Sequence, residues 1–166
     1  MVVKVDRSKA FDPAFVFGSG WTIWKGPPTS NGLEGEEQQD ARSLALSVVD
    51  FVKAARFETC TPQNERVITG EERLGILTER KDVILADAAF GPALMNEAGR
   101  VTLNWVYATS RIPSFGLPGT VLRRWDGLRF FLVLCRHDVG GWYPDIRYLS
   151  HGYLYEPPDL LFAGEA

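Results

Sequence analysis

The sequence has few of the residues on which common enzyme and metal sites depend. It contains only two cysteines and two histidines, which are Cys60, Cys135, His137 and His151. Two cysteines are too few for a disulfide framework, and in a reducing compartment we expect free thiols. Two histidines at this spacing do not form a metal-binding motif. We therefore predict neither a metal nor a cofactor.

Long apolar runs and an excess of positive charge are missing as well. The formal net charge is -3, which gives no electrostatic basis for general binding to nucleic acids or to an anionic membrane. No run approaches the roughly 18 apolar residues of a membrane span, and the first residues lack the apolar core of a signal peptide. We expect a cytoplasmic protein.

The common nucleotide-binding and hydrolase motifs are absent from the sequence. Gly18 and Gly20 begin like a dinucleotide-binding fingerprint, but Ile23 stands where the third glycine should be. There is no phosphate-loop, nucleophile-elbow or HExxH motif. The sequence therefore indicates a fold class better than an activity.

The composition is that of a globular domain, with 45% hydrophobic, 12% aromatic and 23% charged residues. We predict a single domain over residues 1–166. Residues 11–35 are rich in glycine, proline and aromatic side chains and are expected to form an arm packed on the core, whereas residues 155–166 form a C-terminal tail. Within the arm, residues 14–17 and 21–24 are predicted to pair as a short hairpin.

A helix is predicted between residues 36 and 56, because apolar residues recur there at helical spacing. A competing interpretation ends the helix near Asp50 and makes residues 55–60 a strand, since Phe57 and Thr59 favour extended structure. We expect both elements, the helix first and then the strand.

Capping signals and periodicity predict the next elements. Thr69 and Glu72 have the spacing of a capping box, which indicates a short helix after them. A strand is expected at residues 81–86. Asp87 then caps another short helix, which Gly99 ends.

Two further segments complete the middle of the chain. Residues 101–107 alternate between apolar and polar side chains, which predicts a half-buried strand. Residues 112–119 contain Pro113, Gly116 and Pro118 and are predicted to form a loop.

Residues 119–149 carry the strongest fold signal. Their β-branched and aromatic side chains are interrupted by glycine turns at 126–127 and 140–141, which predicts a three-stranded antiparallel meander. A two-residue first turn would place Leu122 opposite Phe131. The middle strand is apolar on both faces, so both faces must be covered. We predict an α+β fold with a curved antiparallel sheet and two or three helices packed on it.

The candidate catalytic residues are Cys135, His137 and Asp138. A thiol, an imidazole and a carboxylate are the parts of an activated nucleophile, so a small cysteine- or histidine-dependent hydrolase or transferase is one hypothesis. Side chains two apart on a strand project in parallel, and Cys135 continues an apolar run. The alternative is therefore a core thiol beside a histidine at the end of a strand.

Arginines and aromatic residues are interleaved along the same strands. The candidate binding residues are Arg124, Trp125, Trp142, Tyr143 and Arg147. This mixture could stack on and pair with a nucleic acid or another anion. Acidic residues lie close by in the sequence, so the alternative is a solvated face whose arginines pair with acids across strands.

Several short segments resemble a group of small bacterial proteins to which no activity is assigned. They are Arg42–Leu46, Glu58–Cys60, Ile68–Leu74 and Gly119–Arg123 followed by Asp126-Gly127. The resemblance covers roughly residues 34–149, and its motifs are a capping box, a strand and a hairpin turn. It implies a bacterial origin and a recurring domain, but it carries over no catalytic or binding residue.

We interpret the chain as a non-catalytic binding module. Tryptophan and tyrosine are enriched in binding hot spots, and here they lie on the predicted sheet edge and on the arm. Its partner would be a protein or a small ligand. The hydrolase or transferase stays open, as does a homo-oligomer joined through an uncovered sheet edge.

Overall fold

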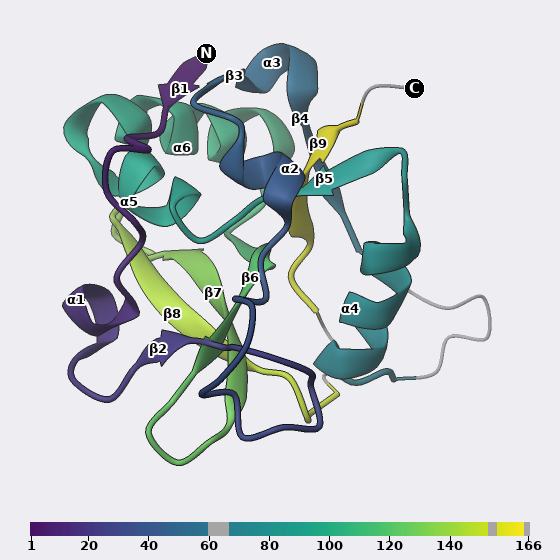
Figure 1. The fold of residues 1–166 in the computed structure, drawn as a ribbon. Helices are drawn as coiled ribbons and strands as arrows, with labels where there is room; N and C mark the ends of the chain where they lie inside the picture. The colour runs from purple at the N-terminus through teal and green to yellow at the C-terminus, as the bar shows by residue number, and fades with distance from the viewer. Residues whose placement is uncertain (60–66, 153–155, 165–166) are drawn as a thin grey trace.

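The structure is a computed structural model that describes residues 1–59, 67–152 and 156–164. Its larger sheet consists of β2 (Thr22–Ile23), β4 (Ala55–Glu58), β5 (Val83–Leu85), β6 (Ser114–Arg123), β7 (Arg129–Arg136), β8 (Trp142–Tyr148) and β9 (Asp159–Ala163), and a two-stranded sheet consists of β1 (Val2–Lys4) and β3 (Val48–Asp50) (Figure 1). The helices in this part of the chain are α1 (Pro13–Phe17), α2 (Ala41–Leu44), α3 (Phe51–Ala54), α4 (Gly70–Glu79), α5 (Phe90–Met95) and α6 (Glu97–Ser110), six where the sequence predicted two or three.

The larger sheet has the strand order β4-β9-β6-β7-β8, with β2 added to β6 and β5 added to β9. The pairs β6–β7 and β7–β8 are antiparallel, whereas β6 meets β9 in parallel, with Gly116 opposite Asp159. The prediction of an α+β fold is confirmed. The sheet is mixed rather than purely antiparallel, because β9 reaches β6 from a distant part of the chain, and its curvature stays a prediction.

Both faces of β7 are buried, as its double apolar pattern predicted. Phe130, Leu132 and Leu134 belong to a core cluster that also contains residues of α5 and α6. Phe131 belongs to a second cluster with Leu74 of α4. Helices therefore cover both sides of this strand, and α4 lies apart from α5 and α6 in Figure 1.

The turn between β6 and β7 is one residue longer than predicted. Leu122 lies opposite Phe130, not Phe131. Arg124 N donates to Leu128 O at 3.0 Å, and Gly127 adopts a φ of 81°. A three-residue loop that ends in a left-handed glycine shifts the register by one.

The predicted strand at residues 101–107 is wrong, because this segment lies in helix α6. Asn96 accepts a hydrogen bond from Gly99 N at 2.7 Å and caps the helix, so Gly99 lies in its first turns and does not end the preceding element. Leu103 and Val106 are buried on one helical face. A Cβ on Gly99 would lie 2.0 Å from Ala93 O, so this glycine allows α5 and α6 to approach closely.

The single helix predicted at residues 36–56 is divided into α2, β3 and α3. Asp40 and Asp50 each cap a new short helix through the amide two residues further on. Between the two helices, β3 pairs with β1. The competing strand after this segment is confirmed as β4, and the prediction of the capped helix α4 and of the strand β5 is also confirmed.

The arm does not form the predicted hairpin. Asp12 accepts a hydrogen bond from Ala14 N, and Pro13 occupies the first turn, so residues 13–17 form helix α1. The following β2 pairs with β6. Trp21 and Trp24 are buried, one in each core cluster.

The loop predicted at residues 112–119 is largely strand β6. The register of β6 against β7 shifts between Leu117 and Leu122, which leaves room for Pro118. In this irregular stretch Gly119 N donates to Ala86 O at 2.8 Å, and Val121 N donates to Gln38 O at 3.0 Å. Distant hydrogen-bond partners, which local sequence does not reveal, stabilise this extended conformation.

Candidate functional site

Cys135, His137 and Asp138 lie at the end of β7 and in the turn that follows. Cys135 is opposite Tyr143 of β8. The ring of His137 stacks on the ring of Tyr143, with 4.2 Å between their centroids. Burial raises the pKa of the Cys135 thiol, and the nearby Asp145 acts in the same direction. An activated cysteine needs the opposite shift, so these surroundings favour an inert thiol.

The remaining cysteine and histidine do not extend this group. Cys60 lies outside the described residues. His151 packs edge-on against Tyr148, with 4.6 Å between the ring centroids. Within residues 1–59, 67–152 and 156–164, no three histidine, cysteine, aspartate or glutamate side chains gather where they could hold a metal ion.

The arginines of β6, β7 and β8 mostly pair with acids or carbonyl groups. Arg124 binds Asp126, and Arg147 binds Glu156. Arg129 binds Glu71 and lies over the ring of Trp24, whereas Arg123 donates to Asn31 O at 2.7 Å. These contacts correspond to the alternative of paired arginines on the sheet.

The aromatic candidate residues differ in how far they are buried. Trp142 is buried between the sheet and its helices, and Tyr143 is half-buried. Trp125 is 70% exposed at the turn after β6. Arg124, beside it, stacks on Phe130 at 4.8 Å. The five predicted binding residues thus differ in burial, and none of them lines the three hollows described below.

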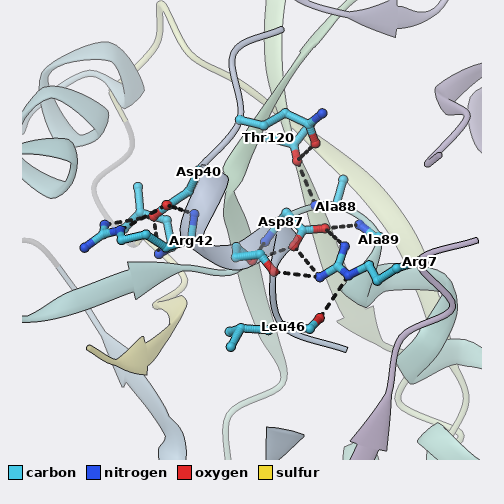
Figure 2. Close-up of polar contacts among 11 residues, drawn as sticks. Arg7, Asp40, Arg42, Leu46, Asp87, Ala88, Ala89 and Thr120 are labelled. Atoms are coloured by element: carbon cyan, nitrogen blue, oxygen red, sulfur yellow. Dashed lines mark hydrogen bonds and ion pairs between the residues drawn. The ribbon is translucent and has the colours of Figure 1, made fainter. Parts of the chain in front are cut away.

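A buried polar cluster connects the start of the chain with α2 and α5. Both Asp87 oxygens accept hydrogen bonds from the Arg7 guanidinium, at 2.9 and 2.8 Å. Ser43 Oγ donates to Asp87 at 2.5 Å, and Ala89 N donates to the same carboxylate at 3.0 Å. Figure 2 shows Arg7 reaching across to Asp87 and to Leu46 O. The cluster fastens the N-terminal segment to the core.

A second cluster of polar side chains lies beside the Asp87 cluster in Figure 2. Asp40 accepts hydrogen bonds from the Arg42 guanidinium and from Leu85 N. Burial would raise the pKa of Asp40, but the hydrogen bonds from Arg42 and Leu85 outweigh it and lower the pKa. Thr120 Oγ1 accepts from Ala88 N at 2.9 Å. These side chains connect residues 85–88 to Asp40 and to Thr120 of β6.

Next to the Asp87 cluster, the arm and α5 enclose an apolar hollow of about 510 Å³. Its walls come from the end of β1, the arm, α1 and α5, and they are formed by Lys4, Val5, Asp6, Lys9, Ala10, Phe11, Asp12, Phe15, Val16, Ala89, Pro92, Ala93 and Asn96. A hollow of this size and composition is typical of a binding site. We call it the α1–α5 hollow.

The aromatic side chains of the hollow differ in exposure. Phe11 is half-buried, whereas Phe15 on α1 is 91% exposed although it lines the hollow. Helix α1 is held by the Asp12 cap at its start and by a hydrogen bond from Gly18 N to Ala14 O at its end. The short helix thus presents Phe15 at the rim.

The charged groups at the rim are unequally engaged. Asp12 accepts a hydrogen bond from Ala14 N. The Ser8 hydroxyl and amide donate to Asp6 and lower the pKa of its carboxyl group. Lys4 and Lys9 are both exposed and line the same hollow. These hydrogen bonds leave the negative charge of both carboxylates in place, so the rim carries charges of both signs.

Two smaller hollows adjoin these features. One of about 290 Å³ shares Lys9, Phe11 and Ala89 with the α1–α5 hollow and reaches Arg7 and Asp87. Another of about 380 Å³ is lined by residues that include Asp40 and Arg42. Their carboxylates already bind arginines of this chain, so they offer little to a further cation.

Comparisons with known proteins found no matching family model, curated protein or solved structure. In the part of the chain that the structure describes, no helix is both long and apolar enough to cross a membrane.

Sequence reasoning did not find the hollow as such. It identified the aromatic arm but assigned a hairpin to residues 14–17, where the structure has α1. The usable signal was Asp12-Pro13, a cap followed by a proline at the first helical position. The opposite wall, formed by Ala89 and Ala93, is apolar and small, and nothing in the local pattern relates it to the arm.

Proposed function

We propose that this protein is a non-catalytic binding module that recognises a segment of a partner protein in the α1–α5 hollow. The observation that carries the proposal is the position of Phe15, which is 91% exposed at the rim of an apolar hollow. Exposed aromatic side chains beside a concave apolar surface are typical of binding hot spots.

The shape of the site favours a macromolecule over a small ligand. A small molecule seated among Val5, Ala89 and Ala93 would leave the outer face of Phe15 in water. A protein segment fills the hollow with one side chain and covers Phe15 with the neighbouring residues. Burying such a phenylalanine contributes about 2 kcal/mol, so covering it is a substantial part of the binding free energy.

Charge specifies the partner further. Lys4 and Lys9 extend from the rim, while Asp6 and Asp12 are engaged by Ser8 and Ala14. An acidic residue next to the inserted apolar side chain would lie near these lysines. The partner segment that we propose is apolar, with an adjacent carboxylate that pairs with Lys4 or Lys9.

The enzymatic alternative has less support. The pKa of the Cys135 thiol is raised by burial, and His137 stacks on Tyr143. Neither feature activates a nucleophile. We favour binding, because the α1–α5 hollow has an exposed phenylalanine at its rim.

The test uses the blocked dipeptide N-acetyl-Asp-Phe-amide as a probe, titrated into the isotope-labelled full chain and followed by amide chemical shifts. We expect saturable shifts at Lys9, Phe11 and Ala93. Phe15→Ala should weaken the affinity about fivefold, and Ala89→Phe, which fills the hollow, should abolish binding. Val101→Ala is the matched control, since Val101 is an exposed apolar residue of α6 outside the hollow.

A second probe tests the charge argument. N-acetyl-Lys-Phe-amide should bind about threefold more weakly than the aspartyl peptide, because exposed charge pairs contribute under about 1 kcal/mol. Equal shifts in the wild type and in a folded Ala89→Phe variant would contradict the proposed site. Sedimentation measures self-association in parallel. If the wild type self-associates and Ala89→Phe does not, the occupant is a second copy and the proposal of a different partner is overturned.

A further inference from the structure

Two arginines converge on the ring of Tyr107, on the opposite end of α6 from its cap. Arg136 of β7 lies with Cζ 4.0 Å from the ring centroid, and Arg111 lies with Cζ 5.5 Å from the same centroid. The backbone brings the two segments together, because Arg136 N donates to Pro113 O at 2.8 Å. One half-buried tyrosine thus holds two guanidinium groups at the surface.

This pair differs from the arginines that form ion pairs with acids. Ion pairs with acids engage Arg7, Arg42, Arg73, Arg80, Arg124, Arg129 and Arg147. Among the described residues, neither Arg111 nor Arg136 lies within ion-pair distance of an acid; the contact of Arg136 Nη1 with His137 O is long, at 3.4 Å. Two guanidinium groups near one ring repel each other, and an anion that contacts both would offset this repulsion.

The backbone at Arg111 is a second, independent observation. Arg111 ends α6 in the left-handed conformation, with φ 58° and ψ 23°, and is the one non-glycine residue with positive φ in the described part of the chain. Glycine or asparagine usually occupies this position, since other residues cost about 1 kcal/mol or more there. A strained conformation that brings a guanidinium to a shared ring is typical of a functional position.

We infer that Arg111, Arg136 and Tyr107 form a binding site for a phosphate monoester group, separate from the α1–α5 hollow. A phosphate monoester carries about -1.5 to -2 charges near neutral pH, which balances two guanidinium groups. The guanidinium fork matches phosphate oxygens and can stack on an aromatic ring while it binds them. Tyr107 is a positioning residue, because its ring orients both arginines without contacting the phosphate.

The experiment titrates inorganic phosphate into the full chain and follows the arginine Nε–H signals. We expect saturable shifts for Arg111 and Arg136, and roughly tenfold weaker binding in Arg111→Gln and in Arg136→Gln, because each loses a charge-assisted hydrogen bond. Arg100→Gln is the matched control, since Arg100 is also an exposed arginine of α6 and its guanidinium donates to Met95 O. Tyr107→Phe should keep the affinity, and Tyr107→Leu should lower it.

Two further probes distinguish the source and the charge of the ligand. Tighter binding of N-acetyl-O-phosphoserine amide than of inorganic phosphate identifies a phosphorylated molecule, and the reverse order identifies free phosphate. Dimethyl phosphate, a monoanion, should bind more weakly than either. Unsaturated shifts shared equally with Arg100, or unchanged binding in folded Arg111→Gln and Arg136→Gln variants, would overturn the site.

Discussion

Asp87 and Asp159 are both fully buried carboxylates that bind an arginine, but they differ in how completely they are satisfied. Asp87 accepts two hydrogen bonds from Arg7, one from Ser43 and one from Ala89 N. Both of its oxygens have partners. These hydrogen bonds replace the hydration that the carboxylate loses on burial.

Asp159, at the start of β9, has a one-sided environment. Its Oδ2 accepts from Arg73 Nε at 2.6 Å, whereas its Oδ1 is buried without a hydrogen-bond partner in the structure. A Cβ on Gly116 would lie 2.5 Å from Oδ1, so the neighbouring strand closes over this oxygen. Burial raises the pKa of Asp159 to about 6, although Arg73 and Arg147 act to lower it.

The comparison shows that an arginine partner alone does not offset the desolvation cost of a buried carboxylate. Asp159 has strong ionic neighbours, including Arg73, which also binds Glu156. The loss of hydration at Oδ1 nevertheless dominates. Complete hydrogen bonding, not the ion pair, distinguishes the two sites.

The largest effect is expected from Asp87→Ala, which removes the satisfied carboxylate. Arg7 and Ser43 would lose their common partner, and the N-terminal segment would lose its attachment to α2 and α5. Breaking a buried pair of this kind costs about 3–5 kcal/mol. Urea unfolding measures it, with the surface pair variant Asp126→Ala as the control, which should lower the stability much less. A loss no greater than that of the control would break the comparison.

Asp159→Asn should change how the stability of the protein depends on pH, because the carboxyl group with the raised pKa is removed. A raised carboxyl pKa means that the folded state holds the proton more tightly than the unfolded state. The stability from that proton is fully present below pH 3.8 and is lost as the pH rises through about 6. The shift corresponds to about 3 kcal/mol. The free energy of unfolding of the variant, relative to that of the wild type, should therefore rise by about that amount between pH 3.5 and pH 7.5.

The measurement is urea unfolding of both proteins across this pH range. Asn at position 159 keeps the shape of the side chain but cannot ionise, so the difference between the curves isolates this group from the other titrating residues. A difference that stays constant with pH would show that Asp159 is ionised in the folded protein as readily as in the unfolded chain.

The sequence predicted the elements whose signals are local, and it missed those that depend on distant partners. The capping box at Thr69 gave α4 because the cap and the helix are adjacent in the chain. Residues 101–107 were predicted as a strand because their alternation also fits one, whereas the Asn96 cap and packing against α5 make them helical. The turn before Arg129 has three residues instead of the predicted two, and this extra residue shifts the pairing of β6 with β7 by one position.

The candidate sites were less predictable than the fold. Cys135, His137 and Asp138 are close in sequence, yet the imidazole stacks on Tyr143 of the neighbouring strand. Arg7 and Asp87 meet although 80 positions separate them, and no local pattern relates the two. Tyr107 was assigned to a strand, so its contact with Arg111 and Arg136 could not be foreseen. These contacts depend on how the strands and helices are arranged in space, and the periodicity of the sequence does not predict that arrangement.

The smallest and most selective effect is expected from Ser43→Ala. Ser43 Oγ donates to Asp87 at 2.5 Å and accepts from Asp87 N at 3.0 Å. Its removal takes one of the two partners of Asp87 Oδ2 and leaves Arg7 bound to both carboxylate oxygens. We expect a loss of about 1–2 kcal/mol, because one hydrogen bond to a charged group is lost while the ion pair stays. Urea unfolding measures the loss against that of Asp87→Ala. A loss as large as that of Asp87→Ala would mean that the serine, and not the Arg7 fork, holds the carboxylate in the core.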